Sequence, residues 1–296
     1  MSERPTGIPP PARCLATLAP LAAEGMVDRA QRELAGGNAR FPSRIAIVRQ
    51  DVVQYRLQAM QRFSISGVQD KISMRLERGR LRAVERDGTH ILKPIPSSPL
   101  PLVADVPANE HVTMLAARAL GIRTAACALI RLQDDELAYV TRRFDRRPDG
   151  SKLLQEDFGV LAGMSEAESG KNYKYSSSYE ELGRLVALHC SARQRDLEEY
   201  FRRVVFCFAV GNGDAHVRNF SILREVDGFV ELSPAYDLLC TNVHLPDESD
   251  LALSILATER HGIFSTSFEA LGSYSAGDFR ALAEAIGLHA DARDRV

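Results

Sequence analysis

The fold is decided by the stretch Gly211-Asn212-Gly213-Asp214-Ala215-His216-Val217-Arg218-Asn219. This stretch follows an apolar run, residues 204–210, that we expect to be buried. A second carboxylate, Asp237, comes after a short predicted hairpin. The pattern therefore predicts a buried helix that leads into a polar loop carrying chemically active side chains.

Asp214, Asn219 and Asp237 all offer hard oxygen ligands, which suit Mg²⁺ bound through one or two carboxylates and substrate phosphates. Asp214 and Asn219 stand five positions apart, as do the Asp and Asn of the protein-kinase catalytic loop. There the Asp accepts the proton of the substrate hydroxyl and the Asn holds a metal ion. The alternative is a polar turn that caps a buried helix, because Gly and Asn are common turn residues.

The composition bounds the class of protein. The 296 residues can form one large or two ordinary domains, and 45% apolar and 26% charged residues are usual for a globular chain. A net charge of −2 gives no electrostatic argument for non-specific binding to nucleic acid. No apolar run approaches the roughly 20 residues of a membrane span, and Pro20 interrupts the mildly apolar 15–23. We therefore expect a cytoplasmic protein without a membrane partner.

Cysteine usage agrees with a reducing compartment. The five cysteines have no C-x-x-C spacing, which argues against a disulfide framework or a structural zinc site. Lysine is rare beside arginine, so each lysine is more informative than usual. The lysines are Lys71, Lys93, Lys152, Lys171 and Lys174.

A candidate phosphate-binding loop lies at Phe63-Ser64-Ile65-Ser66-Gly67-Val68-Gln69-Asp70-Lys71. Small residues before a predicted strand allow backbone N–H groups to face an anion, and Lys71 adds a positive charge. The loop has one glycine and not the G-x-G-x-x-G pattern, so an ordinary loop is the alternative.

Alternating residues predict a strand at 71–76, and the turn at 77–80 predicts a return strand at 81–84. A second turn signal, Asp87-Gly88, precedes a third predicted strand at 90–94, which carries Lys93. A loop, two strands and a Lys-bearing strand is the order of parts in a kinase small lobe. The alternative for Lys93 is a solvent-exposed lysine at a strand end.

After an extended, proline-rich segment at 94–107, residues 108–120 predict an amphipathic helix. Its expected apolar face is Val112, Leu115, Ala116, Ala119 and Leu120. Glu110, in the first turn, can pair with Lys93 as a helix Glu does in kinases, although the helix dipole alone also favours a carboxylate there.

The remaining patterns divide the chain. A hairpin is predicted at 126–132 and 137–141, and Pro148-Asp149-Gly150 marks a boundary. Helices are predicted at 26–34, 155–161, 179–190, 197–210, 267–274 and 276–288, residues 50–61 suit a helix or a strand, and 171–178 reads as a polar loop. The expected fold is α+β and bilobal, like a protein kinase, with a β-rich small lobe and a mostly α-helical large lobe. Its parts are a poorly defined segment 1–60, the small lobe 61–147 and the large lobe 148–296.

Several motifs occur together and in order. They are Ser64-Ile65-Ser66-Gly67-x-Gln69-x-Lys71, Ile91-Leu92-Lys93-Pro94, Asn109-Glu110, Arg143-Phe144-Asp145-Arg146, Gln155-Glu156-Asp157, Gly213-Asp214-x-His216-x-x-Asn219 and Tyr236-Asp237. Over residues 60–240 this combination resembles the HipA family of serine/threonine kinases, the toxins of bacterial toxin–antitoxin systems.

The resemblance implies roles for individual residues, with ATP and Mg²⁺ as cofactors. Asp214 would be the catalytic base, and Asn219 and Asp237 would hold Mg²⁺. ATP would be bound by the loop residues Ser66, Gly67, Val68, Gln69, Asp70 and Lys71, by Lys93, by the hinge Arg142, Arg143 and Phe144, and by Gln155, His216, Val217, Arg218, Asn219, Tyr236 and Asp237.

Two departures from HipA point to the short HipT type. About 60 residues precede the loop, so the small N-terminal subdomain of HipA would be supplied by a separate small HipS-like protein. The loop reads Ser-x-Ser, as in HipT, which makes Ser64 and Ser66 the expected autophosphorylation sites. The resemblance also implies a helix-turn-helix antitoxin, DNA contact only through that antitoxin, and a protein substrate related to translation, such as an aminoacyl-tRNA synthetase.

The function expected from the sequence is therefore that of a serine/threonine protein kinase. Two alternatives remain: a small-molecule phosphotransferase that uses the same Asp and Asn, and an inactive binding module in an antitoxin–DNA complex. The intact set of Lys93, Asp214, Asn219 and Asp237 speaks against the inactive module.

Overall fold

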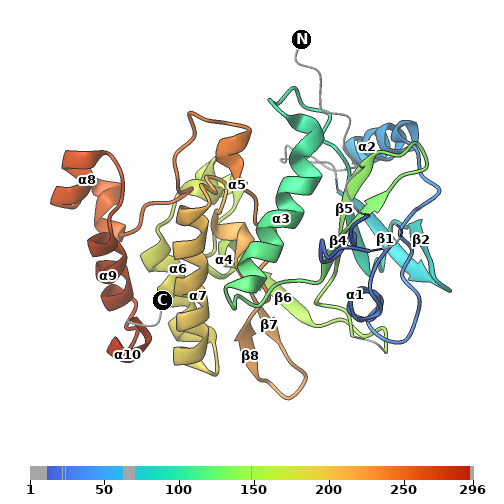
Figure 1. Cartoon of the computed structure of the whole chain (residues 1–296). Coiled ribbons are helices and arrows are strands. Elements are labelled where there is room, and N and C mark those ends of the chain that lie inside the picture. Colours follow the sequence, from blue (N-terminus) through green and yellow to red (C-terminus); the bar gives the residue numbers. More distant parts are fainter. Residues whose placement is uncertain (1–11, 22, 24, 63–70, 148, 294–296) are drawn as a thin grey trace, which may run out of the picture. The chain divides into compact units, whose positions relative to one another are not determined.

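A computed structural model describes residues 12–21, 23, 25–62, 71–147 and 149–293 (Figure 1). The predicted phosphate-binding positions Ser66, Gly67, Val68, Gln69 and Asp70, and the predicted autophosphorylation site Ser64, lie outside these residues. Lys71, at the end of the same loop, is described and exposed.

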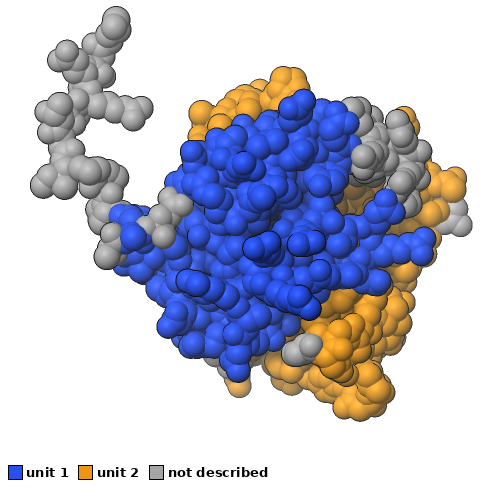
Figure 2. All heavy atoms as spheres, turned by 90° about the vertical axis from the view of Figure 1, so that its right-hand side faces the viewer, with its two compact units in different colours: residues 1–95, 126–142 blue, residues 96–125, 143–296 orange. Residues whose placement is uncertain are grey.

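The chain forms two compact units, coloured separately in Figure 2. Unit 1 comprises Met1–Ile95 and Ala126–Arg142, and unit 2 comprises Pro96–Ala125 and Arg143–Val296. The chain thus passes between the units after residues 95, 125 and 142. The division into 1–60, 61–147 and 148–296 stays a prediction about functional parts.

Unit 1 contains a five-stranded antiparallel sheet with the order β2-β1-β3-β5-β4. The strands are β1 (Ile72–Glu77), β2 (Arg80–Ala83), β3 (His90–Lys93), β4 (Cys127–Arg131) and β5 (Leu137–Arg142). The predicted strands and the predicted hairpin are confirmed, and β1 alternates between buried Ile72 and Met74 and less buried Ser73 and Arg75. The period-2 pattern is therefore a reliable signal here.

The part of unit 1 that the structure describes also contains helices that pack on this sheet. The predicted helix at 26–34 is α1 (Asp28–Ala35), which ends at Gly36 with φ 73°, a left-handed conformation that glycine adopts without a steric penalty. Residues 50–61, which suit either a helix or a strand, belong to the helix α2 (Arg49–Arg62). Leu34 from α1 and Val52 from α2 are buried in one hydrophobic cluster with Met74 and Leu92 from the sheet.

Unit 2 is mostly helical. Its longer helices are α3 (Val106–Ala119), α6 (Tyr179–His189), α7 (Arg193–Ala209) and α9 (Ala276–Ala285), and α6 packs beside α7 and α9 (Figure 1). Shorter helical segments are η1 (Val103–Asp105), α4 (Phe158–Leu161), α5 (Glu166–Ser169), η2 (Tyr173–Tyr175), η3 (Val217–Asn219), η4 (Thr241–Val243), η5 (Ala257–His261), α8 (Thr266–Leu271) and α10 (Ala290–Arg293). The expectation that 94–107 is extended is wrong at its C-terminal end, where η1 and the first turn of α3 form.

The buried face predicted for the helix at 108–120 is also wrong. Val112 is 50% exposed and Leu120 is 64% exposed, whereas the polar residues Glu110 and His111 are buried beside Met114. Apolar periodicity predicts the buried face of a helix when the helix packs against an apolar core. The helix α3 instead buries the polar groups of Glu110 and His111.

A three-stranded antiparallel sheet with the order β6-β7-β8 completes unit 2. The strands are β6 (Leu154–Asp157), β7 (Ser221–Arg224) and β8 (Val230–Leu232). The helix predicted at 155–161 is therefore wrong in its first half, because Gln155 pairs with Leu223 in the ladder. The helix α4 begins only after Asp157, whose carboxylate accepts the backbone N–H of Val160 at 3.0 Å and caps the helix.

Two general expectations from composition can be compared with the structure. All five cysteines are free thiols, as their spacing predicts. Within the described parts of the chain, no helix combines the length and the apolar character that crossing a membrane requires.

Candidate active site

The polar loop that follows α7 is held in place by its own backbone. Val204 and Cys207 are fully buried in the last turns of α7. Gly211 has φ 62° and reverses the chain, after which the backbone N–H of Asn212 donates to the carbonyl of Cys207 at 2.9 Å. The helix that the sequence predicts therefore ends where the reactive residues begin.

Gly213 allows a close approach of two loops. Its N–H donates to the Thr241 hydroxyl at 2.8 Å, and a Cβ at this position would lie 2.4 Å from the carbonyl oxygen of Ser249. A side chain cannot be accommodated at that distance without a shift of backbone. Gly213 thus fixes the start of the segment that carries Asp214.

Three groups surround one oxygen of the Asp214 carboxylate. The Tyr175 hydroxyl donates to Oδ1 at 2.6 Å, and the Lys174 Nζ lies 3.8 Å and the His216 Nε2 3.9 Å from the same oxygen. The Asp214 side chain is 49% exposed, so the carboxylate is accessible to solvent while one of its oxygens is anchored. An accessible, oriented carboxylate is what a general base requires.

His216 links Asp214 to Asn219. The backbone N–H of His216 donates to Asn219 Oδ1 at 3.1 Å, and the N–H of Asn219 donates to the His216 carbonyl at 2.9 Å. Burial lowers the pKa of the His216 imidazole to about 4, against the opposing effect of the Asp214 carboxylate. The ring is therefore neutral at physiological pH, and the loop gains no positive charge from it. Val217, between the two, is fully buried.

The charge of Asp237 acts on the His216 imidazole in the direction that raises its pKa, against the larger effect of burial. The Asp237 backbone has φ 55°, a left-handed conformation that is uncommon for a residue other than glycine and is typical of functional sites. The preceding Tyr236 is anchored, because its hydroxyl donates to the carbonyl of Arg218 at 2.9 Å. Burial raises the pKa of Tyr236 above its ordinary value, so the phenol remains a donor.

The strand β6 contributes Gln155 to this side of unit 2. The Gln155 carboxamide donates to the Ser221 hydroxyl at 3.1 Å, and the Tyr236 hydroxyl lies 3.2 Å from the same oxygen. Asp157, at the end of β6, binds Arg218 with an Oδ2–Nε distance of 3.2 Å. The predicted positions Gln155, Arg218 and Tyr236 are thus brought together with the loop.

The predicted hinge residues have different surroundings. Arg143 binds the buried Asp145 through both of its carboxylate oxygens, at 3.0 and 2.8 Å, and Phe144 packs on the Tyr236 ring with 5.5 Å between centroids. Arg142 belongs to unit 1, where its guanidinium lies against Gly36 and donates to the carbonyl of Glu33 at the C-terminal end of α1. This contact gives Arg142 a structural role, and its nucleotide contact stays a prediction.

Lys93 is also in unit 1, on β3. It is 2% exposed and its Nζ lies 5.4 Å from the centroid of the Tyr139 ring, so the alternative of a solvent-exposed lysine is wrong. Burying an ammonium group costs free energy unless other groups compensate its charge. A buried lysine is therefore more typical of a functional position than of a structural one. Glu110, in unit 2, is 1% exposed, and its pairing with Lys93 stays a prediction.

The donor set of unit 2 suits Mg²⁺. Asp237 offers a carboxylate, and the Asn219 carboxamide oxygen is already oriented by the His216 N–H. Among the described residues there is no group of three or more His, Cys, Asp or Glu side chains that could hold a metal by itself. A site with one carboxylate, one carboxamide and substrate phosphates is the usual arrangement for Mg²⁺, which keeps several ligands from outside the protein.

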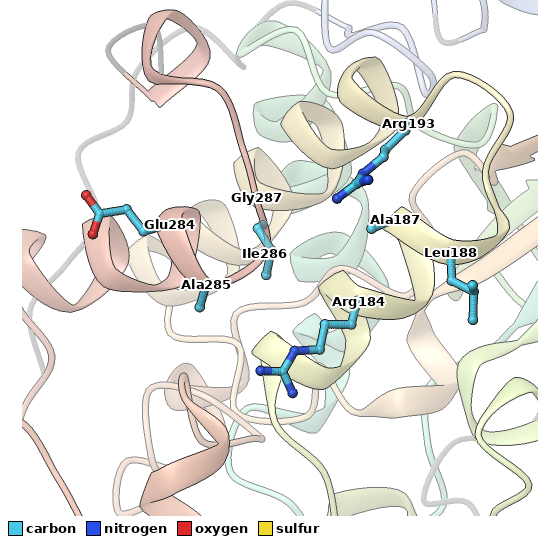
Figure 3. A pocket seen from close by; sticks show the side chains of 8 residues that line it. All are labelled: Arg184, Ala187, Leu188, Arg193, Glu284, Ala285, Ile286 and Gly287. Carbon is cyan, nitrogen blue, oxygen red and sulfur yellow. The ribbon is translucent and has the colours of Figure 1, made fainter.

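A surface depression of about 350 Å³ lies elsewhere in unit 2 (Figure 3). It is lined by Arg184, Ala187, Leu188, Arg193, Glu284, Ala285, Ile286 and Gly287. None of the predicted site residues contributes to it, so it is separate from the loop that carries Asp214.

Lys174 and Tyr175 are further candidates for a functional role, because both lie close to the Asp214 carboxylate. No motif in the sequence selects them. The segment 171–178 reads as a polar loop, although its two lysines were unusual in a lysine-poor chain. No spacing rule connects Tyr175 to a loop that lies 39 residues away.

The chain is similar to known proteins over most of its length. The profile of the HipA-like C-terminal domain matches residues 63–296. A Haemophilus influenzae protein with the name "Putative kinase" is 28% identical over 265 residues, covering 85% of this chain and 75% of that protein. A Sinorhizobium fredii protein, "Putative kinase Y4dM", is 32% identical over 233 residues, covering 73% of this chain and 54% of that protein.

A solved structure shows the same fold. It is the Shewanella oneidensis HipA toxin–antitoxin complex with HipB and operator DNA, which matches with a TM-score of 0.61 and 23% identity over 84% of this chain. This chain spans 60% of the matched chain. The α+β, protein-kinase-like fold expected from the sequence is therefore confirmed. Since the family profile covers most of its length, the chain belongs to the HipA-like C-terminal domain family.

Proposed function

We propose that this protein is an ATP- and Mg²⁺-dependent serine/threonine protein kinase that acts as the toxin of a bacterial toxin–antitoxin pair. The observation that supports the proposal best is the linked arrangement of Asp214, His216 and Asn219 in one loop. With Asp237, this loop would supply an accessible carboxylate and two oxygen ligands of the kind that bind a nucleotide-associated metal ion. Membership in the HipA-like family and relatives named as kinases support the same conclusion.

In this proposal each residue of unit 2 has a limited task. The oxygen of the substrate hydroxyl attacks the γ-phosphorus of ATP, and Asp214 accepts the proton of that hydroxyl. The bond between the γ-phosphorus and the β,γ-bridging oxygen breaks, so ADP leaves. Asn219 and Asp237 would hold Mg²⁺, which neutralises phosphate charge when bound. Catalysis of this type depends mainly on positioning and on electrostatic stabilisation, because the transferred phosphoryl group needs little covalent assistance.

The proposal also assigns roles to residues outside unit 2. Lys93 would orient the nucleotide phosphates, with Lys71 at the end of the phosphate-binding loop, and Glu110 of unit 2 would pair with Lys93. Ser64 and Ser66 would be autophosphorylated as a form of self-control. The proposed substrate is a translation-related protein, and the proposed partners are a helix-turn-helix antitoxin, through which DNA is contacted, and a small HipS-like protein.

The test is phosphoryl transfer by the purified protein. Wild type and Asp214→Asn are incubated with Mg²⁺ and γ-labelled ATP, with and without dephosphorylated casein, and the labelled sites are mapped. We expect label on serine or threonine with wild type and none with Asp214→Asn. Transfer to an aminoglycoside but not to any protein would favour the small-molecule phosphotransferase, and absence of both transfer and ATP binding would favour the inactive binding module.

A further inference from the structure

The segment Tyr173–Tyr175 forms a short helical turn, η2, that lies against the loop carrying Asp214. Its residue Tyr175 makes the shortest contact with Asp214, a hydrogen bond of 2.6 Å from the hydroxyl to Oδ1. A donor bound to an ionised carboxylate at this distance is a charge-assisted hydrogen bond, which is about twice as strong as a neutral one.

Two neighbouring side chains contact the Tyr175 ring. The Lys174 Nζ lies over one face of the ring, 4.8 Å from its centroid, and the ring meets the His216 imidazole edge-on with centroids 5.4 Å apart. Burial and the Asp214 carboxylate raise the pKa of Tyr175 above its ordinary value, so the phenol keeps the proton that it donates. The hydroxyl is thus a fixed donor.

The contacts to Asp214 fall on one side of its carboxylate. Within the described ranges, the interactions of this carboxylate with Tyr175, Lys174 and His216 all involve Oδ1. A carboxylate that is held through one oxygen keeps the acceptor sites of the other, Oδ2, for a further hydroxyl group. The Lys174 ammonium group lies beside the same oxygen, with 3.8 Å between Nζ and Oδ1.

We propose that Tyr175 is a positioning residue for the general base Asp214, and that Lys174 supports it by holding the Tyr175 ring and by placing a positive charge beside Oδ1. This inference rests on the proposed kinase function. Tyr175 fixes the orientation of the carboxylate so that Oδ2 meets the hydroxyl of the substrate. The polar segment 171–178 is accordingly part of the catalytic apparatus and not a surface loop without a role.

The opposite possibility is that Tyr175 occupies the place of the substrate hydroxyl and blocks it. The two possibilities predict changes of opposite sign, because removal of a positioning group slows the reaction whereas removal of a blocking group accelerates it. The single atom removed in Tyr175→Phe distinguishes them.

The matched control is Tyr274→Phe. The Tyr274 hydroxyl donates to the Glu259 carboxylate at 2.7 Å, which is the same kind of bond at the same kind of distance, and the Tyr274 ring packs on Phe208 and Phe268. Any general effect of deleting a tyrosine–carboxylate bond from unit 2 is therefore measured separately.

The experiment compares rates of label transfer from Mg-ATP to the protein itself and to dephosphorylated casein. For Tyr175→Phe we expect the rate at saturating ATP to fall about ten- to a hundredfold, which corresponds to the loss of a hydrogen bond to a charged group. The ATP concentration at half-maximal rate and the melting temperature should change little, and Tyr274→Phe should transfer at the wild-type rate.

A second pair of variants tests Lys174. Lys174→Gln should lower the rate of label transfer at saturating ATP. Lys174→Arg keeps the positive charge and should retain most of the wild-type rate. A wild-type or higher rate for Tyr175→Phe would overturn the positioning role, and a higher rate would identify Tyr175 as a block. If wild type shows no transfer that depends on Asp214, the proposed function is wrong and this inference is wrong with it, whereas normal transfer by Tyr175→Phe contradicts the inference alone.

Discussion

The backbone N–H of His216 donates to the side-chain oxygen of Asn219, and the N–H of Asn219 donates back to the carbonyl of His216, at 3.1 and 2.9 Å. This reciprocal pair closes η3 and orients the Asn219 carboxamide. One residue thus stabilises the turn and would present the same oxygen to the proposed metal site, so its substitution should affect both stability and Mg²⁺ dependence.

Asn219→Ala removes both the acceptor for the His216 N–H and the proposed metal ligand. We expect phosphoryl transfer to fall at least about a hundredfold, since the loss of a metal ligand is added to the loss of a buried hydrogen bond. Asn219→Asp keeps an oxygen at the same place and should retain more activity than Asn219→Ala. Rates over a range of Mg²⁺ concentrations, with melting temperatures in EDTA, separate the two effects. An unchanged rate and Mg²⁺ requirement in Asn219→Ala would exclude Asn219 from the metal site.

Gly213→Ala tests the close approach of two loops beside Asp214. The new methyl group would lie 2.4 Å from the Ser249 carbonyl oxygen, so backbone must move. We expect a loss of about 1–3 kcal/mol in the free energy of unfolding and reduced transfer.

Gly277→Ala is the matched control for Gly213→Ala. Position 277 lies in α9, where an added methyl group meets nothing closer than the Ser275 hydroxyl at 3.4 Å. This variant should be neutral or more stable by up to about 1 kcal/mol, because alanine is the better helix residue. Chemical denaturation measures both, and equal stabilities would contradict the steric argument.

The stability of the protein should depend on the protonation of His90, a buried residue of β3. Burial lowers the pKa of His90 to about 4, with the hydrogen bond to Leu34 acting in the opposite direction. The ring contacts the Leu34 carbonyl at 2.9 Å and the Thr89 hydroxyl at 2.8 Å. Because the Leu34 carbonyl can only accept, the neutral ring donates from Nε2 and accepts from Thr89 at Nδ1.

Between pH 4 and about 6.5 the unfolded chain therefore binds more protons at this residue than the folded chain. The free energy of unfolding should rise with pH in that window, by up to about 1.4 kcal/mol per pH unit for one proton. His90→Gln should reduce this slope without changing the sign of the remaining pH dependence. Denaturation at pH 4.5, 5.5 and 6.5 provides the measurement, and an identical slope in the variant would show that His90 does not titrate in this way.

Replacing Ser64 and Ser66 together by glutamate should weaken ATP binding. Each phosphate group adds about −1.5 to −2 charge, and glutamate imitates part of it beside the proposed triphosphate site. We expect a reduced affinity for ATP in calorimetry, and a double alanine variant should bind ATP like the wild type. Equal ATP affinity in the glutamate and alanine variants would contradict self-control through this loop.

Local patterns predicted a large part of the fold correctly. The strand β1 follows alternating residues, and α1 ends at Gly36, close to the end of the helix predicted at 26–34. These elements could be predicted because their hydrogen bonds or capping residues lie within a few positions of one another, or because a half-buried strand has a period of two.

Predictions failed where distant residues changed the outcome. Residues 155–157 have a helix-like pattern but form a strand, because β6 pairs with β7 far along the chain. The buried face of α3 carries Glu110 and His111, which a rule based on apolar spacing does not select.

The sequence alone was sufficient to indicate the family and to propose Asp214, Asn219 and Asp237 as site residues, since these inferences depend on residue type and on motif spacing. The tertiary structure alone decided that Lys93 is buried and that Tyr175 and Lys174 reach the Asp214 carboxylate. The reason is physical, because a contact between residues 39 positions apart depends on how one turn packs against another loop. The sequence around Tyr175 and the sequence around Asp214 have no local pattern from which this contact could be predicted.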